Sequence, residues 1–265
     1  MTKRIGISLV IYVAWIAVTL LGARLIVADD TTLNELVTSG IGWHFAAAIA
    51  LLLTAISVFK WRDMHFTRPH SLVRTLWFPG IYLVLFASGV AFLGAPPLGV
   101  VVFVVINTLM VGVSEELMFR GVLFRALAAS MSIWRAIIVT TVLFGAVHTL
   151  NVFITGELGE ALVQSVAATM SGLVLIAIVI RTGSIWPAIT YHFLWDCLLF
   201  LVSSSVASGN QGVPTGDPGP LAFYIPVLLN LPNFICALIL LRHVGRSHGS
   251  TLQRHSAPGD TAGRL

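Results

Sequence analysis

Residues 98–120 read LGVVVFVVINTLMVGVSEELMFR, and this stretch decides the fold. The seventeen residues 98–114 carry no charge, and Glu115, Glu116 and Arg120 then follow within six positions. An α-helix needs about 20 mostly apolar residues to cross about 30 Å of hydrocarbon. Ionisable side chains within such a span are costly and usually face the interior of a helix bundle. The stretch therefore predicts a transmembrane helix with acidic groups turned inward.

The composition of the whole chain agrees with a membrane protein. Of 265 residues, 57% are hydrophobic and 10% are charged, and the mean hydropathy is +0.94. A soluble domain carries about 25% charged residues, so this class is excluded. Cys197 and Cys236 both lie in apolar runs, which excludes a secreted scaffold held together by disulfides. The net charge of +4 fits cytoplasmic loops better than a nucleic-acid surface, and we expect no nucleic-acid partner.

Apolar stretches long enough to span a bilayer recur along the chain. They cover 5–27, 41–59, 75–95, 98–119, 137–156, 161–181, 184–205 and 220–241. The first exceeds the 7–15-residue core of a signal peptide and has no clean cleavage site, so we expect an uncleaved span. The prediction is an all-α, polytopic transmembrane bundle of about eight spans. It forms one unit over 1–241, and a polar cytoplasmic tail, 242–265, is expected to be disordered.

Basic residues orient this bundle. With a cytoplasmic N-terminus, 14 of the 15 Lys and Arg residues fall on the inner side, and only Arg24 lies near the outer end of a span. The inner set is Lys3, Arg4, Lys60, Arg62, Arg68, Arg74, Arg120, Arg125, Arg135, Arg181, Arg242, Arg246, Arg254 and Arg264. The positive-inside rule therefore predicts that both termini are cytoplasmic. His44 is expected at the outer interface.

Ionisable side chains within the expected spans form three short patterns. They are Glu115-Glu116…Arg120, Phe144…His148 and His192…Asp196. Glu116 and Arg120 are four residues apart and can pair on one helix face. Glu115 points about 100° away from Glu116 and is free to meet another helix. His192 and Asp196 are also four residues apart, so one face presents both.

The three patterns are expected at a similar depth. Glu115 and His148 each lie fifteen residues from a turn at 130–133, which at 1.5 Å per residue gives similar heights. Arg120 is expected where its helix emerges into the cytoplasm, so Glu115 would lie about 10 Å below the inner surface. His192, nine residues after the preceding inner turn, would lie about 13 Å below it. We therefore expect one cluster near the inner leaflet.

In this order and on separate apolar helices, the patterns resemble the CPBP family of intramembrane proteases. This family is also called the type II CAAX prenyl endopeptidase or abortive-infection family, and its signature is Glu-Glu-x-x-x-Arg, Phe-x-x-x-His and His-x-x-x-Asn or Asp. The resemblance covers about residues 98–205. The third motif ends in Asp196, where prenyl-processing members commonly carry Asn. The resemblance implies a multi-pass endopeptidase of the bacterial plasma membrane that acts on peptides or membrane proteins.

The resemblance also implies a role for each motif residue. Peptide hydrolysis needs a deprotonated water and donors for the developing oxyanion. Glu115 would be the base, His148 would help to hold the water, and His192, positioned by Asp196, would donate to the oxyanion.

The remaining motif residues would support the site, and the cofactor stays open. The supporting residues are Glu116, Arg120 and Phe144. The family has also been described as metal-dependent, and a zinc ion could use two imidazoles and a carboxylate. Its ligands would be Glu115, His148 and His192. No HExxH motif is present, so hydrolysis without a metal is favoured.

Two other functions are kept open. The first is a membrane protein of the same fold without protease activity, acting as an immunity or scaffolding factor. The second is a proton-coupled transporter with a Glu/His/Asp relay, which is less favoured because the chain lacks the repeated hydropathy pattern common in secondary carriers.

Overall fold

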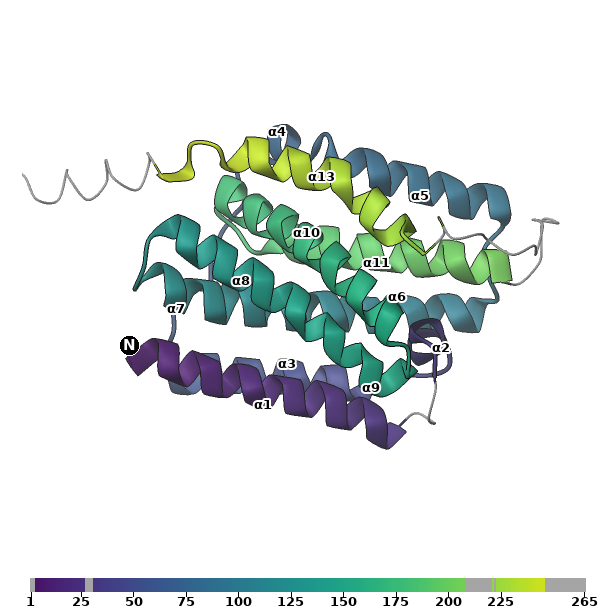
Figure 1. The fold of residues 1–265 in the computed structure, drawn as a ribbon, viewed down its shortest axis with the longest axis horizontal. Helices are drawn as coiled ribbons and strands as arrows, with labels where there is room; N and C mark the ends of the chain where they lie inside the picture. The colour runs from purple at the N-terminus through teal and green to yellow at the C-terminus, as the bar shows by residue number, and fades with distance from the viewer. Residues whose placement is uncertain (1–2, 27–30, 208–220, 222, 246–265) are drawn as a thin grey trace, which may run out of the picture.

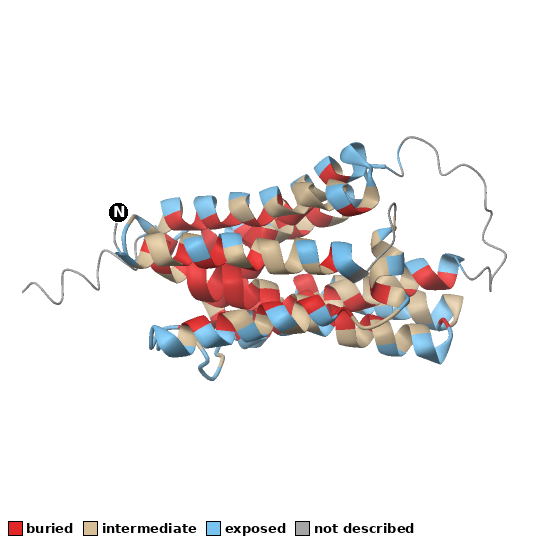
Figure 2. Cartoon of the chain, turned by 90° about the horizontal axis from the view of Figure 1, so that it is seen from below, coloured by how far each residue is buried: buried red, intermediate tan, exposed pale blue. Residues whose placement is uncertain are grey.

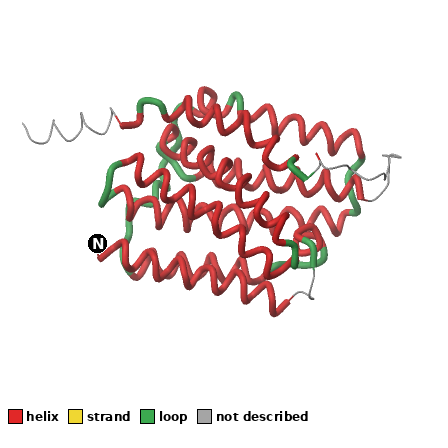
Figure 3. The backbone as a smooth tube through the Cα atoms, viewed as in Figure 1, coloured by secondary structure: helices red, strands yellow, loops and turns green. Residues whose placement is uncertain are grey.

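The computed structural model describes residues 3–26, 31–207, 221 and 223–245. All regular structure in these residues is helical, and no strand occurs among them (Figure 3). The all-α prediction is therefore confirmed. The predicted tail, 242–265, lies outside the described residues except for its first four positions.

Eight long helices form the body of the described chain. They are α1 (Lys3–Ile26), α3 (Trp43–Val58), α5 (Pro79–Leu93), α6 (Leu98–Glu116), α8 (Ile133–His148), α10 (Leu158–Thr182), α11 (Trp186–Ala207) and α13 (Ile225–Leu241). Shorter helices connect them: α2 (Leu33–Thr38), α4 (Leu72–Leu76), η1 (Leu117–Leu123), α7 (Phe124–Ala128), η2 (Thr149–Asn151) and α9 (Val152–Thr155). Each long helix coincides with one predicted apolar stretch.

Among the described residues, five helical segments are long and apolar enough to cross a membrane. They are Lys3–Leu25, Leu98–Ala128, Ile133–Thr155, Leu158–Thr182 and Trp186–Ala207. The other three long helices, α3, α5 and α13, are apolar but have at most 17 residues. These segments support a multi-pass membrane protein, while the count of eight spans and the side of the termini stay predictions.

The long helices run up and down the bundle, and α1 begins at the same end at which α13 finishes, on opposite sides of the molecule (Figure 1). We call this the N-terminal end, where α1 begins and α13 finishes. At the opposite end, here called the far end, lie α2, α9 and the beginning of α13 (Figure 1). In the interior, α10 packs against α8 and α13, and α11 packs against α6 and α5.

Buried residues are densest in the half of the bundle nearer the N-terminal end (Figure 2). Every residue of 117–124 is buried there. Helices in a bilayer associate through close packing rather than through the hydrophobic effect, and Gly145 of α8 permits such packing. A Cβ on Gly145 would collide with Thr169 of α10 and lie 2.7 Å from the carbonyl oxygen of Ser165. This close approach places the end of α8, with its histidine, against α10.

Candidate active site

Arg120 and Glu116 form a buried ion pair. Arg120 Nη1 lies 2.7 Å from Glu116 Oε1, and the side chains are 1% and 0% exposed. Arg120 Nη2 also donates to the Gly172 carbonyl at 3.0 Å, and the guanidinium lies 4.4 Å from the centre of the Phe144 ring. The predicted pairing is confirmed, but the expectation that Arg120 emerges into the cytoplasm is wrong. The side chain is enclosed, and helix continues to Ala128.

The pair lies where α6 passes into a π-helix, η1, which no sequence pattern predicted. Its widened turn is visible at Phe124, whose N–H donates to the carbonyl of Phe119, five residues back. All seven residues of η1 are buried. Single π turns within α-helices are frequent at functional sites. Here the π turn begins directly after Glu116 and carries Arg120.

His192 of α11 lies among three carboxyl groups. Its Nδ1 is 2.9 Å from Glu116 Oε1, and its Nε2 is 3.4 Å from Asp196 Oδ2 and 3.8 Å from Glu115 Oε2. Glu116 Oε1 therefore contacts both the Arg120 guanidinium and the His192 imidazole, and it accepts from His192 Nδ1. The sequence predicted the proximity of Asp196 but missed the direct contact of Glu116 with His192.

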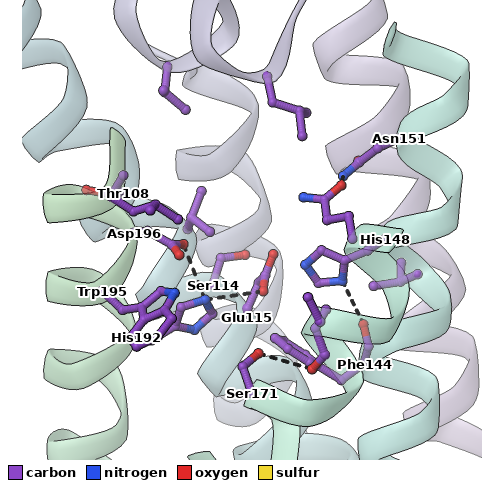
Figure 4. Close-up of a pocket in the computed structure, with 18 of the residues that line it drawn as sticks. Thr108, Ser114, Glu115, Phe144, His148, Asn151, Ser171, His192, Trp195 and Asp196 are labelled. Atoms are coloured by element: carbon purple, nitrogen blue, oxygen red, sulfur yellow. Dashed lines mark hydrogen bonds and ion pairs between the residues drawn. The ribbon is translucent and has the colours of Figure 1, made fainter. Parts of the chain in front are cut away.

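His148, the last residue of α8, faces the same site from the opposite wall (Figure 4). Its Nδ1 donates to the carbonyl of Phe144 at 2.7 Å. A neutral imidazole with its proton on Nδ1 presents Nε2 as an acceptor. The Phe144 ring contacts both imidazoles: its centre lies 5.0 Å from the ring centre of His148 and 5.9 Å from the ring centre of His192.

Glu115 lies between the two imidazoles (Figure 4). Its side chain is 15% exposed, and its Oε2 atom is buried without a hydrogen-bond partner among the described residues. The neighbouring Ser114 accepts a hydrogen bond from Trp15 Nε1 at 2.8 Å, which attaches this turn of α6 to α1. A buried acceptor without a partner is unfavourable by about 1–3 kcal/mol. The position suits a donor such as a bound water.

All four predicted catalytic side chains line one cavity of about 350 Å³. Its walls come from α1, α2, α3, α6, α8, η2, α9, α10, α11 and α13. His44 also lines it and is 4% exposed, whereas its predicted place at the outer interface stays a prediction. Single polar residues such as His44 carry no spacing signal, and the sequence could not assign them to the cavity.

The zinc alternative would use Glu115, His148 and His192. In the part of the chain that the structure describes, no three His, Cys, Asp or Glu side chains are grouped so that they could hold a metal ion. His192 Nδ1 contacts Glu116 and His148 Nδ1 donates to a backbone carbonyl, which leaves Nε2 of each ring for other contacts, so the cofactor stays open. We derive no catalytic step through a metal.

A comparison with protein-family models identifies the region that carries this site. The model described as type II CAAX prenyl endopeptidase Rce1-like matches residues 97–198. The matched segment contains all three motifs and nearly coincides with the predicted core of 98–205. Neither the curated proteins nor the solved structures gave a match. This match over residues 97–198 supports the resemblance to the type II CAAX prenyl endopeptidase (CPBP) family that the three motifs indicate.

Proposed function

We propose that the protein is an intramembrane endopeptidase in which Glu115 activates a water molecule for attack on a peptide bond. The family match supports a CAAX-type protease, a hydrolase, at the family level. The observation that carries the proposal is the buried Oε2 of Glu115, which has no described hydrogen-bond partner and lies between His148 and His192.

In the first step, Glu115 takes a proton from the water while the water oxygen bonds to the scissile carbonyl carbon. His148 Nε2 accepts the other water proton in a hydrogen bond and so orients the lone pair. In the second step the C–N bond breaks, and the proton held by Glu115 passes to the leaving amine. General base catalysis of this kind contributes about 10²–10⁴-fold.

The negative charge that develops on the carbonyl oxygen needs a donor. His192 can supply one as an imidazolium, which carries a proton on each ring nitrogen: Nδ1 donates to Glu116, and Nε2 donates to the oxyanion. Asp196, 3.4 Å from Nε2, accepts rather than donates and therefore positions the imidazole. Arg120 keeps Glu116 ionised and in place. The substrates are peptides or membrane proteins, and we propose no nucleic-acid partner.

The test compares membranes that contain the wild type, Glu115→Gln or Glu160→Gln, with new peptide N-termini identified by mass spectrometry. Glu160 is an exposed residue of α10 outside the cavity, which makes it a matched control. Cleavage products are expected with the wild type and with Glu160→Gln, and their loss is expected with Glu115→Gln. Undiminished products from correctly folded Glu115→Gln protein would reject Glu115 as the base and favour a function without proteolysis.

A further inference from the structure

We propose that the active-site cavity is entered from the far end of the bundle, and that this end faces away from the cytoplasm. The substrates would then be peptide segments exposed on the extracytoplasmic side of the membrane. This inference rests on the proposed function and names the substrate class that the site can reach. It replaces the sequence-based expectation of a site near the inner leaflet.

The cavity lies in the half of the bundle toward the far end. On α1 the lining residues fall within 15–23, and on α13 within 225–233, the first half of that helix. Residues of α2 and α9, which lie at the far end, complete the wall. Ile225, also a lining residue, is 48% exposed, so the cavity lining includes a residue at the surface of the described chain where α13 begins.

At the N-terminal end, the connection between α3 and α4 closes the bundle. The carbonyl of Gly183, at the turn between α10 and α11, accepts hydrogen bonds from Thr67 Oγ1 at 2.6 Å and from His65 Nδ1 at 2.9 Å. Ile185 N–H donates in turn to the His65 carbonyl at 3.0 Å. Met64, in the same connection, is 1% exposed. Together with the buried residues 117–124, this connection separates the cavity from that end.

Polar atoms without partners mark the cavity wall away from the catalytic cluster. Both ring nitrogens of His44 and the Oδ1 atom of Asn233 are buried without hydrogen-bond partners among the described residues, and both side chains line the cavity. A buried polar atom is normally satisfied by protein or water. These atoms therefore point to a hydrated passage that can accept a peptide backbone between the far end and Glu115.

The exposed charges distinguish the two ends. Described basic residues that are exposed at the N-terminal end include Arg62, Arg68, Arg74, Arg135 and Arg242. At the far end, the described acidic residues that are exposed are Glu35, Glu157 and Glu160, and the exposed basic residue among those described there is Arg24. Because basic residues accumulate on the cytoplasmic side, the closed end faces the cytoplasm and the open end faces away from it.

Sided cysteine labelling tests this access without requiring a known substrate. In a chain with Cys197→Ala and Cys236→Ala, one reporter is introduced as Ser171→Cys, and a second, on another wall of the cavity, as Thr19→Cys. A membrane-impermeant, positively charged methanethiosulfonate is applied to intact spheroplasts and to inside-out vesicles. Two exposed positions report sidedness: Arg68→Cys at the closed end and Glu160→Cys at the far end.

In spheroplasts, both cavity reporters and the far-end control Glu160→Cys are expected to be modified. In inside-out vesicles, the closed-end control Arg68→Cys is expected to react, and both cavity reporters are expected to be protected. Modification of the cavity reporters from the vesicle side only, or from neither side, would overturn the inference. So would modification of Arg68→Cys in spheroplasts. Labelling does not need catalysis, so a failure here is distinct from a failure of the Glu115→Gln test.

Discussion

At the residue scale, the arrangement around His192 depends on one cation. Arg120 is bound to Glu116 at 2.7 Å with almost no exposure, and Glu116 in turn contacts His192 Nδ1 at 2.9 Å. Removing one partner of a buried ion pair leaves an uncompensated charge and is unfavourable by about 3–5 kcal/mol. The ion pair therefore determines both the stability of the core and the orientation of His192.

We expect Arg120→Leu to destabilise the protein by about 3–5 kcal/mol, because Glu116 would be left charged in the core. The double variant Glu116→Gln/Arg120→Leu should recover part of this loss, because the unpaired charge is gone. The measurement is equilibrium unfolding in detergent micelles. Equal destabilisation of the single and double variants would contradict a role of the pair in compensating charge.

Substitutions of Asp196 distinguish whether the site needs a negative charge or only a hydrogen-bond acceptor at this position. Asp196 lies 3.4 Å from His192 Nε2, and an Asn would keep an oxygen that can accept from this nitrogen. We expect Asp196→Asn to retain more peptide cleavage than Asp196→Ala, with both proteins folded. The initial cleavage rates of the two variants give the comparison. Equal rates would mean that the side chain does not position the imidazole.

Individual residues show how far the sequence could predict the site. The three motifs identified Glu115, His148 and His192, and spacing predicted the Glu116–Arg120 pair. The contact between Glu116 and His192 was missed because it joins α6 to α11, and spacing within one helix does not encode the rotation of another. His44 was missed for the same reason, since its burial depends on packing against α1, where Gly22 lies against it.

At the element scale, close packing of α8 against α10 sets the position of His148. The approach depends on Gly145, where a Cβ would meet Thr169 and the backbone of Ser165. We expect Gly145→Ala to destabilise the protein by about 1–3 kcal/mol through overpacking, and to reduce cleavage by displacing the end of α8. Thermal unfolding and cleavage rates of the same preparation would show both effects.

Gly80→Ala is the matched control for that variant, because Gly80 also lies in a helix and has open space where a Cβ would extend. Its stability should be unchanged or slightly increased, since Ala favours helix more than Gly does. If Gly145→Ala behaved like Gly80→Ala, close packing of α8 on α10 would not be needed to hold His148.

The apolar stretches of the sequence predicted the positions of the helices more accurately than their first residues or their type, α or π. The stretch 75–95 was predicted as one span, whereas α5 begins at Pro79 after the short helix α4. Proline suits the first helical turn because its missing N–H has no partner there in any case. The π-helix η1 left no trace in the pattern, because residues 117–124 are buried on every side and show no polar face.

At the scale of the whole molecule, the helix that carries Glu115 continues farther than the sequence predicted. Glu115 lies thirteen residues before the end of α7 at Ala128, which is about 20 Å along the helix at 1.5 Å per residue. The sequence-based value of about 10 Å took Arg120 as the end of the span. A charged residue marks a membrane boundary only when it is solvated, and the sequence does not distinguish this case from a charge paired inside the bundle.

The closed end of the bundle is also joined to α1 by an ion pair whose strength depends on pH. Arg4 donates two hydrogen bonds of 2.8 Å to Asp63, in the connection that covers this end. Burial raises the pKa of the Asp63 carboxyl, but the hydrogen bonds and charge of Arg4 outweigh it, and the pKa falls below its ordinary value of 3.8. A carboxyl with a lowered pKa stabilises the folded state at pH values above the ordinary one, and this contribution is lost as the pH falls through the lowered value.

We therefore expect Asp63→Asn to lower stability by about 0.2–1 kcal/mol at neutral pH, the range for a partly exposed ion pair. The difference from the wild type should stay constant from pH 7 down to about 5 and should shrink only below the ordinary carboxyl pKa. Unfolding midpoints measured across this pH range in micelles provide the test. A difference that already disappears near neutral pH would mean that another titrating group, and not Asp63, controls the attachment of α1 to the closed end.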